Sequence, residues 1–453
     1  MMQSMLKELW RLPCPRRFAG DDYFSLQVRA IFADMYEMSL NATQYLSLEA
    51  MKKLQDKRLM HILRQAALGV PFYSDYLSGI RSIEDFHNLA PVTKERMRQE
   101  LDAGRTTNSK FRSYAIPQFT SGSTGVPFHF FLDRNMLARR AAIYRRMLSW
   151  AGRTREDVIV SLMPKIHPGL EQESILLYCG GPQDVDDNLS KYYQLFENKS
   201  LILQSRTSHL IRLAQLMARD IRKFNFKALI SYTEQLFPEV RRFLESVFGA
   251  PIFNYYASNE ITAIGQECEL HNGFHVNSEW VLAEVVDDEG RKLEPGGEGN
   301  IILTSLDNEV MPFIKYKIGD RGHFIPGACR CGRSLPRLYV EGRNVNSFPL
   351  SNGKIGYFST LIYPITSIIH KIYQYQVIRH SVGHFSIVIV PTPDFGNDDK
   401  NLIIEKFQDY LGKSAKVDFK ETSFIEATVA GKQRAFLNMA QDDYMGGTAV
   451  GAR

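Results

Sequence analysis

The stretch "QFTSGSTGVPFHFF" runs from Gln118 to Phe131 and contains six consecutive small residues, Thr120 to Gly125. Four of these six side chains carry a hydroxyl, and the other two residues are glycines. Small residues let a ligand approach the backbone closely, and glycine permits a positive φ. Successive backbone N–H groups can then form an anion-binding nest, to which hydroxyl groups add donors. The stretch therefore predicts a phosphate-binding loop; the alternative is a flexible surface loop, which Ser/Gly/Thr clusters usually form.

Two common phosphate motifs are excluded by the spacing. No Gly-Lys-Ser/Thr follows the small residues, so the loop is not of the Walker A type. The G-x-G-x-x-G spacing of dinucleotide-binding folds is also not met.

The composition bounds the class of protein. The chain has 453 residues, 44% of them hydrophobic and 23% charged, which favours a globular protein of two or three domains. The net charge of +5 requires neither a nucleic-acid nor a membrane partner. Five cysteines argue against a disulfide scaffold, and neither a signal-peptide core nor a membrane-length apolar run is found. We therefore expect a cytoplasmic protein without a membrane span or a nucleic-acid partner.

Short apolar runs alternate with helical patterns in the middle of the chain, which predicts a largely parallel sheet covered by helices. The expected strands are Val158–Met163, Ser200–Ser205, Ala228–Ser231 and Ile252–Ala257. The expected helices are "SHLIRLAQLMARDIRKF" and "FPEVRRFLESVFG".

The flanking regions have different patterns. The first 110 or so residues favour helices, including one capped by Ser47 and one that begins at about Thr93. The segment "EWVLAEVVDDEGRKLEPGGEGNIILTSL" is typical of a β-hairpin. From about Phe348 onward, new strands and a helix predict a small α+β domain of about 100 residues.

Four further stretches carry residues that suit a nucleotide. "NYYASNE" (Asn254 to Glu260) places aromatic rings before a carboxylate that can hold Mg²⁺, and "YKIGDRG" (Tyr316 to Gly322) presents an acid after a glycine. "YVEGRN" (Tyr339 to Asn344) contains an arginine, and "VAGKQRAF" sets Lys432 in a glycine-led loop. Taken singly, each is more often an ordinary strand end, turn or solvated lysine.

The order of these stretches is more specific than any one of them. Together these motifs resemble the adenylate-forming superfamily of acyl-CoA synthetases and ligases. In chain order they are TSGSTG, aromatic-x-S-x-E, Y-x-x-G-D, GR and a late GK. "LAPVTKERMR" and "CRCGRSLPRLYVEGR" resemble segments of phenylacetate–CoA ligases and of their relatives in capsular-polysaccharide clusters. The resemblance covers about residue 85 to about residue 440.

The resemblance implies a role for each matching position. Thr120 to Gly125 would hold the β- and γ-phosphates of ATP, Tyr256 would lie against adenine, and Asp320 would bind the ribose hydroxyls. Glu260 would hold Mg²⁺, and Lys432 would stabilise the charge that develops during adenylation.

Other positions complete the expected site. Asn259 would contact the α-phosphate, and Arg343 would contact ribose or phosphate. With Glu260 and Lys432 as the catalytic pair, the full nucleotide-binding set is Thr120, Ser121, Gly122, Ser123, Thr124, Gly125, Tyr255, Tyr256, Ala257, Ser258, Asn259, Asp320 and Arg343.

Three positions depart from the superfamily pattern. Val126 and Pro127 follow the loop where a basic residue is more common, so the loop has less cationic help with phosphate. Asn346 stands where the hinge is usually an aspartate, and Ala257 replaces a common glycine.

The cysteines suggest a separate metal site. Cys268 and His271 form one close pair, and Cys329 and Cys331 form another, about 60 residues away. Four thiolate and imidazole ligands make a closed tetrahedral zinc site, and some relatives that resemble this pattern carry zinc. The alternative is unrelated loop residues, since C-x-C is tighter than the usual zinc-knuckle spacing. His275 lies in an alternating segment and is expected to be an ordinary strand residue.

The sequence thus predicts an α/β protein with a large N-terminal ATP- and acid-binding domain (1–342), a hinge (343–346) and a small C-terminal α+β lid (347–453). The implied reaction is carboxylate adenylation with ATP and Mg²⁺, followed by acyl transfer to coenzyme A, in a monomer or homodimer. The resemblance favours an aryl or arylacetic acid.

Two other functions stay open at this point. In the first, the acyl group passes to an amine or to a carrier-protein thiol, or a flavin-like cofactor is adenylylated. In the second, the chain is a catalytically degenerate nucleotide-binding protein, against which the presence of Glu260, Asp320 and Lys432 counts.

Overall fold

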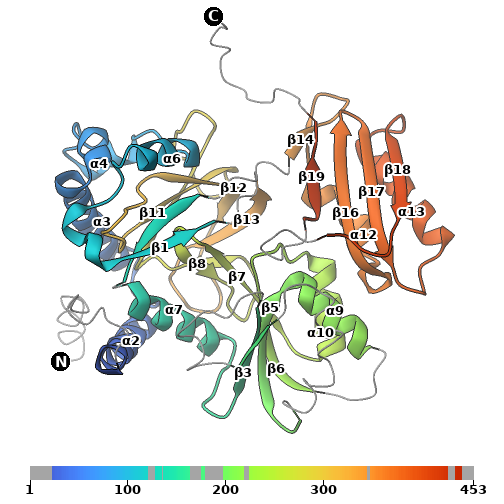
Figure 1. Ribbon diagram of the computed structural model, residues 1–453, viewed down its shortest axis with the longest axis horizontal. Helices are drawn as coiled ribbons and strands as arrows, with labels where there is room; N and C mark the ends of the chain where they lie inside the picture. The colour runs from blue at the N-terminus through green and yellow to red at the C-terminus, as the bar shows by residue number, and fades with distance from the viewer. Residues whose placement is uncertain are drawn as a thin grey trace, which may run out of the picture.

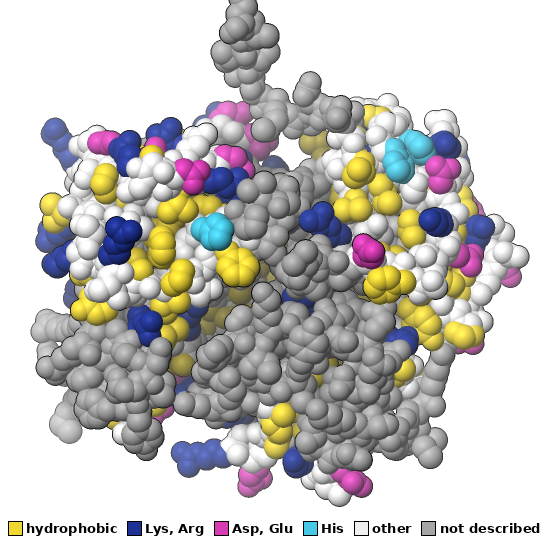
Figure 2. Space-filling model, in the orientation of Figure 1, with side chains coloured by type: hydrophobic (Ala, Val, Ile, Leu, Met, Phe, Trp, Pro, Cys, Tyr) yellow, Lys and Arg dark blue, Asp and Glu magenta, His cyan; other side chains and the backbone are white. Residues whose placement is uncertain are grey.

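The computed structural model describes residues 23–120, 128–134, 136–163, 175–178, 197–218, 224–343, 347–426 and 434–440. Ser121 to Pro127, Asn346 and Lys432 lie outside these residues. Within the described part, no helix is both long and apolar enough to cross a membrane. On the face shown in Figure 2, the basic and acidic side chains of the described residues are interspersed over both domains.

The chain begins with a helical region, as predicted. It contains α2 (Tyr23–Thr43), α3 (Leu48–Gly69), α4 (Pro71–Tyr76), α5 (Ile83–His87), α6 (Lys94–Asp102) and the 3₁₀ turn η2 (Ser109–Tyr114). Both predicted helix starts are confirmed. The Ser47 hydroxyl accepts a hydrogen bond from the Ala50 N–H, and the Thr93 hydroxyl accepts one from the Arg96 N–H.

The candidate phosphate loop joins the two strands of a hairpin. Strand β1 (Ala115–Phe119) pairs antiparallel with β2 (His129–Asp133), and Phe119 faces His129 at the end nearest the loop. The Thr120 N–H donates to the Phe128 carbonyl oxygen at 2.9 Å, so the base of the loop is closed by backbone hydrogen bonding.

An eleven-stranded sheet forms the centre of the large domain, in the order β10-β11-β12-β13-β9-β8-β7-β6-β5-β3-β4 (Figure 1). Its parallel half consists of β3 (Val158–Met163), β4 (Ile175–Tyr178), β5 (Ser200–Arg206), β6 (Asn225–Tyr232) and β7 (Ile252–Ser258). Among the residues that the structure describes, the helices of this half are α7 (Met136–Trp150), α9 (Thr207–Met217) and α10 (Pro238–Phe248). The predicted parallel, helix-covered sheet is therefore confirmed for this half.

The sheet becomes antiparallel after β7. The antiparallel strands are β8 (Thr262–Gln266), β9 (Phe274–Val276), β10 (Val281–Val286), β11 (Gly299–Ser305), β12 (Tyr316–Ile325) and β13 (Arg337–Arg343). Strands β10 and β11 form the predicted hairpin. The turn between β7 and β8 thus marks the change from parallel to antiparallel pairing.

The C-terminal domain is α+β, as predicted. It contains β14 (Ser347–Pro349), β15 (Ile355–Tyr357), α11 (Phe358–Leu361), α12 (Tyr363–Thr366), η4 (Ile369–Lys371), β16 (Ile372–Ser381), β17 (His384–Pro391), α13 (Asn397–Leu411), β18 (Lys416–Glu421) and β19 (Phe436–Asn438). Four of its strands form a sheet in the order β18-β17-β16-β19.

The two domains touch through α9 and α10. The Gln215 side-chain amide, which is buried, donates to the carbonyl oxygens of Ile369 and Ile372 at 2.9 and 2.8 Å. The Phe237 and Phe358 rings lie 6.5 Å apart across the same boundary. One cluster of buried apolar residues includes side chains of both domains, so this contact excludes water in the arrangement described.

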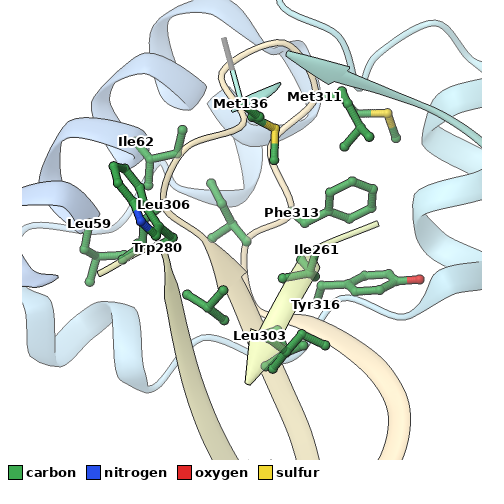
Figure 3. Close-up of a cluster of buried hydrophobic side chains, with 14 of the residues drawn as sticks. Leu59, Ile62, Met136, Ile261, Trp280, Leu303, Leu306, Met311, Phe313 and Tyr316 are labelled. Carbon is green, nitrogen blue, oxygen red and sulfur yellow. The ribbon is translucent and has the colours of Figure 1, made fainter. Parts of the chain in front are cut away.

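A second apolar cluster supports the antiparallel half of the sheet. Leu59 and Ile62 of α3, Met136 of α7 and Leu303 of β11 point into it (Figure 3). Ile261 and Tyr316 also belong to this cluster, and Figure 3 shows the Tyr316 hydroxyl at its edge. Each fully buried aliphatic side chain here contributes about 1.5–3 kcal/mol relative to an exposed one.

A fully buried ion pair joins α2, α7 and the segment before β10. Arg146 Nη1 lies 2.7 Å from Glu279 Oε1, and both side chains are 0% exposed. Thr43 Oγ1 donates to the same carboxylate at 2.8 Å. Burial raises the pKa of Glu279, but the charge and hydrogen bonds of Arg146 outweigh burial and hold this pKa below its ordinary value.

Replacing Arg146 by methionine should therefore lower the free energy of unfolding by about 3–5 kcal/mol, because Glu279 stays buried without its cation. In the wild type the Glu279 pKa is lowered on folding, so its contribution is present above the unfolded-state pKa and is lost as pH falls through the folded-state pKa. In Arg146→Met the largest influence that lowers the Glu279 pKa is lost, and burial is opposed mainly by hydrogen bonds such as that from Thr43. We therefore expect the Glu279 pKa to rise and the variant to recover stability as pH falls. Urea unfolding at several pH values checks this.

The matched control is Arg291→Met, which breaks an exposed ion pair with Asp287. This change should leave the unfolding midpoint unchanged. Equal midpoints for wild type and Arg146→Met at neutral pH would contradict the role of the buried pair.

Candidate active site

Glu260 lies in the turn where the sheet changes from parallel to antiparallel. The Ser258 hydroxyl accepts a hydrogen bond from the Ile261 N–H at 2.9 Å, and the Ile261 side chain is buried in the cluster of Figure 3. Thr262 begins β8 with a φ of +75°, in the left-handed region. The turn is thus held on both sides of Glu260, whose side chain is only 7% exposed.

Two side chains from distant parts of the chain share one oxygen of this carboxylate. Lys94 Nζ donates to Glu260 Oε1 at 3.2 Å, and the Tyr316 hydroxyl donates to the same atom at 3.1 Å. Burial, with Glu260 nearby, raises the pKa of Tyr316, so this hydroxyl stays a donor. Among the described residues, no hydrogen-bond donor contacts Glu260 Oε2, which leaves that oxygen for a ligand.

The first residue of the phosphate loop is part of the same group. Thr120 Oγ1 accepts from Lys94 Nζ at 3.3 Å and from the Phe128 N–H at 3.2 Å. Asn259 Nδ2 donates to the Phe119 carbonyl oxygen at 3.3 Å, so the β7–β8 turn lies directly beside the start of the loop. The remaining predicted loop residues, Ser121, Gly122, Ser123, Thr124 and Gly125, lie outside the described residues.

A second trio lies on the neighbouring strands. The Tyr256 hydroxyl donates to Asp320 Oδ2 at 2.6 Å, and Arg343 Nε lies 3.6 Å from Asp320 Oδ1. Asp320 and Arg343 are paired across β12 and β13. The Tyr256 ring lies 5.5 Å from the Phe274 ring. Aromatic, acidic and basic groups thus meet within reach of one another, as the sequence predicts.

Burial governs the ionisation of this trio. It raises the pKa of Asp320, against the opposing effects of Arg343 and of the Tyr256 hydrogen bond, and the Glu260 charge raises this pKa further. Burial, reinforced by Asp320, likewise raises the pKa of Tyr256 well above its ordinary value. The Glu260 charge thus acts on the pKa of Asp320, and perturbed carboxyl groups of this kind are common at functional sites.

Not every predicted residue joins this group. Tyr255 packs against the buried residues of α7, where Arg140 and Arg146 are its charged neighbours, and also against the apolar cluster of Figure 3. Its place among the nucleotide-binding residues stays a prediction. Ala257 is exposed on β7, and Lys432 lies outside the described residues.

Lys94 was missed by the sequence-based reasoning, although it stands in the segment "LAPVTKERMR" that contributes to the family resemblance. Sequence alone shows a lysine in the first turn of a helix. Only the pairing of the preceding residues with β12 brings it to Glu260.

Three cysteines and one histidine form a compact cluster away from this site. The ligand atoms of Cys268, His275, Cys329 and Cys331 all lie within 4.8 Å of one another. Cys268 Sγ is 3.8 Å from Cys329 Sγ, and Cys331 Sγ is 3.4 Å from His275 Nε2. His275 Nδ1 lies 2.9 Å from the Leu335 carbonyl oxygen, so the Nδ1–H donates there and Nε2 faces the sulfur atoms. Burial lowers the pKa of His275 to about 4 and raises that of Cys268 to about 12.

The histidine of this cluster is not the predicted one. His271 Nδ1 lies 3.3 Å from Glu267 Oε2 and 3.2 Å from Arg241 Nη1, and His275 on β9 takes the place beside the thiols. The pairing of β9 with β13 carries His275 toward the Cys329–Cys331 segment, whereas the C-x-x-H spacing favoured His271. The predicted ligand set is corrected accordingly.

Known proteins have sequences and folds similar to those of this chain. Residues 351–439 match the family model of the CapK C-terminal domain. A phenylacetate–coenzyme A ligase of Thermus thermophilus is 26% identical over 326 residues, covering 67% of this chain and 72% of the relative. Protein CapK of Staphylococcus aureus is 24% identical over 423 residues, covering 85% of this chain and 89% of CapK.

A solved structure has a similar fold over most of the chain. The 2-hydroxyisobutyryl-CoA ligase in its postadenylation state matches with a TM-score of 0.73 and 18% identity, over 86% of this chain and 90% of the ligase. This chain has the fold of the adenylate-forming ligases and carries a CapK-type C-terminal domain. The family resemblance and the fold class that the sequence predicts are confirmed.

Replacing Tyr256 by phenylalanine should remove the hydroxyl donor to Asp320 and keep the ring. Because a hydrogen bond to a charged group contributes about 1.5–3 kcal/mol, the free energy of unfolding should fall within that range at neutral pH. Urea unfolding measures the change. Tyr339→Phe, which alters a half-exposed ring stacked on His323, is the control and should unfold like the wild type. A Tyr256→Phe protein as stable as this control would show that the bond to Asp320 contributes nothing.

Proposed function

We propose that this protein is an AMP-forming acid–thiol ligase, which activates a carboxylic acid with ATP and transfers the acyl group to coenzyme A. The observation that carries the proposal is the convergence of Thr120, Tyr256, Glu260, Asp320 and Arg343 in one site on an adenylate-forming fold. These residues come from four separate segments of the chain, and their types suit phosphates, a base, a metal ion and a ribose.

The residues suit the first half-reaction. A carboxylate oxygen of the acid attacks the α-phosphorus of ATP, the bond to the bridging oxygen breaks, and pyrophosphate leaves. Asp320 accepts hydrogen bonds from the ribose hydroxyls, Tyr256 contacts the adenine, and Arg343 contacts ribose or phosphate. Lys432 stabilises the charge that develops at the α-phosphate and the carboxylate. Glu260 has an uncommitted oxygen for Mg²⁺, which when bound neutralises phosphate charge.

In the second half-reaction the thiol sulfur attacks the acyl carbon, AMP leaves, and the thiol proton is released. We assign residues 347–453 as a lid and 343–346 as its hinge, because the chain between the domains is short and each domain has a sheet of its own.

The acid is proposed to be an aryl or arylacetic acid. The support is the similarity to proteins named phenylacetate–coenzyme A ligase.

A second function, transfer to an amine or a carrier-protein thiol, is kept because one relative is named CapK and the family model is a CapK domain. Exchange of labelled pyrophosphate into ATP, measured with each acid of a library, identifies the acid that is activated. This assay does not require the acceptor to be known. Adding coenzyme A, an amine or a carrier protein to the activated acid then separates the two functions.

Glu260→Gln should lower pyrophosphate exchange by about 10²-fold, because it removes the carboxylate charge that binds Mg²⁺. The exposed Glu289→Gln is the control and should exchange at the wild-type rate. Wild-type exchange by Glu260→Gln would exclude the assigned role.

Lys432→Met should lower adenylation by about 10²-fold while thioester formation from a preformed acyl-adenylate is largely preserved. The two half-reactions are measured separately by pyrophosphate exchange and by thioester release. Equal losses in both would contradict a role confined to adenylation.

We also infer that Cys268, His275, Cys329 and Cys331 hold one structural zinc ion. The four donor atoms face one another, and their composition suits zinc in a closed tetrahedral site. The cluster packs against Met51, Trp150 and Leu335, so an ion here would tie the N-terminal helices to the β9–β13 pair.

Elemental analysis should find about one zinc per chain, and His275→Ala and Cys329→Ser should lose it together with thermal stability. His271→Ala, a change of the nearby histidine that lies against Glu267, is the matched control and should retain the metal. Retention of zinc by His275→Ala with its loss in His271→Ala would overturn the assignment, as would metal-free wild-type protein prepared without chelator.

A further inference from the structure

The phosphate loop has no cation immediately after it, since Val126 and Pro127 stand there. Pyrophosphate and ATP carry several negative charges, and a hydrogen bond from a charged donor to such an anion is roughly twice as strong as one from a neutral hydroxyl or backbone N–H group. A cation supplied from elsewhere in the fold would fill this need. Lys94 Nζ lies 3.3 Å from Thr120 Oγ1 at the base of the loop.

The fold fixes Lys94 through the backbone. The Val92 N–H donates to the Lys315 carbonyl oxygen at 2.8 Å, and the Lys317 N–H donates to the Val92 carbonyl oxygen at 2.9 Å. Residues just before α6 therefore run beside the start of β12 as a short parallel bridge to Tyr316. Lys94, the first residue of α6, is thereby placed on the same side of Glu260 as the Tyr316 hydroxyl.

The surroundings of Lys94 leave it able to serve two partners. Its side chain is 28% exposed, whereas that of Glu260 is 7% exposed. Among the described residues, Lys94 is the one cation that forms an ion pair with Glu260. The ammonium group also lies 5.4 Å from the centre of the Phe128 ring. An ammonium group has three donors. The contacts with Thr120 Oγ1 and Glu260 Oε1 use two of them.

We propose that Lys94 is the phosphate-binding cation that the loop lacks, and that it also orients Glu260. This inference rests on the proposed ligase function. Through Oε1, Lys94 and Tyr316 hold the Glu260 carboxylate so that Oε2 faces the ligand. The third donor of Lys94 contacts the β- or γ-phosphate beside Thr120. When the bond between the α-phosphorus and the bridging oxygen breaks, the electron pair goes to the leaving pyrophosphate, and Lys94 stabilises that charge.

The test compares ligands that carry or lack the β- and γ-phosphates. Lys94→Met should bind Mg-ATP and pyrophosphate about tenfold more weakly or worse, because a charge-assisted contact is lost. Its affinity for AMP should stay within about twofold of the wild type. Lys94→Arg, which keeps the positive charge, should recover part of the lost affinity for Mg-ATP and pyrophosphate. Calorimetric titration of each ligand into the full-length protein gives these affinities.

The matched control is Lys227→Met. The Lys227 side chain is 33% exposed, close to the 28% of Lys94. Its Nζ lies 2.8 Å from Asp157 Oδ2, and the Asp157 side chain is almost fully buried. This pair lies at the opposite end of the parallel strands, where β3 and β6 begin. Loss of Lys227 should lower stability and leave the affinities for ATP and AMP unchanged.

Three results would overturn the inference. If Lys94→Met bound ATP like the wild type, Lys94 would have no phosphate role, and the ligase function would stand. If Lys94→Met lost affinity for ATP and for AMP equally, Lys94 would support the structure of the site and would not contact the β- or γ-phosphate. If the wild type bound neither ATP nor AMP, the proposed ligase function would fail and the inference with it.

Discussion

The buried carboxylate of Glu260 is the point on which the site depends. A carboxylate with 7% of its side chain exposed is costly unless donors and a cation surround it. Lys94 from the N-terminal helical region and Tyr316 from the antiparallel half of the sheet supply them, and Ile261 anchors the turn in the core. Three parts of the chain that are distant in sequence therefore meet at the Glu260 turn.

The sheet explains why such a site forms where it does. Parallel strands bring their carboxyl ends to one edge, and at β7 the pairing changes to antiparallel. The turn after β7 places Glu260 near Thr120 at the start of the phosphate loop, and β12 and β13 present Asp320 and Arg343 alongside. The C-terminal domain lies against α9 and α10 through Gln215 and apolar contacts, so its position is set by one face of the parallel half.

The sequence predicted the elements that depend on local pattern. Val158–Met163 is a strand with the predicted bounds, and Ser47 and Thr93 cap helices, because apolar periodicity and side-chain capping act over a few residues. The family motifs also predicted that Tyr256, Asp320 and Arg343 belong together. No bound nucleotide tests their assigned roles, which stay predictions, and the Lys432 prediction lies outside the described residues.

The errors and omissions concern long-range pairing. His271 fits a short spacing rule, but His275 reaches the thiols because β9 pairs with β13. Tyr255 and Tyr256 are adjacent in sequence, yet the Tyr256 hydroxyl donates to Asp320 while Tyr255 packs against buried residues of α7. Lys94 gives no local signal, since only the bridge between Val92 and Tyr316 carries it to Glu260.

The central claim is that an acid is activated as its adenylate at the Glu260 turn. The most direct test follows the acid's own oxygen atoms: an accepted acid, labelled with heavy oxygen in its carboxyl group, is converted to its thioester by the wild-type protein. The thiol displaces AMP by breaking the bond between the acyl carbon and the bridging oxygen, so the account predicts that each AMP carries one labelled oxygen on its phosphate. Unlabelled AMP, or label in orthophosphate accompanied by ADP, would contradict it.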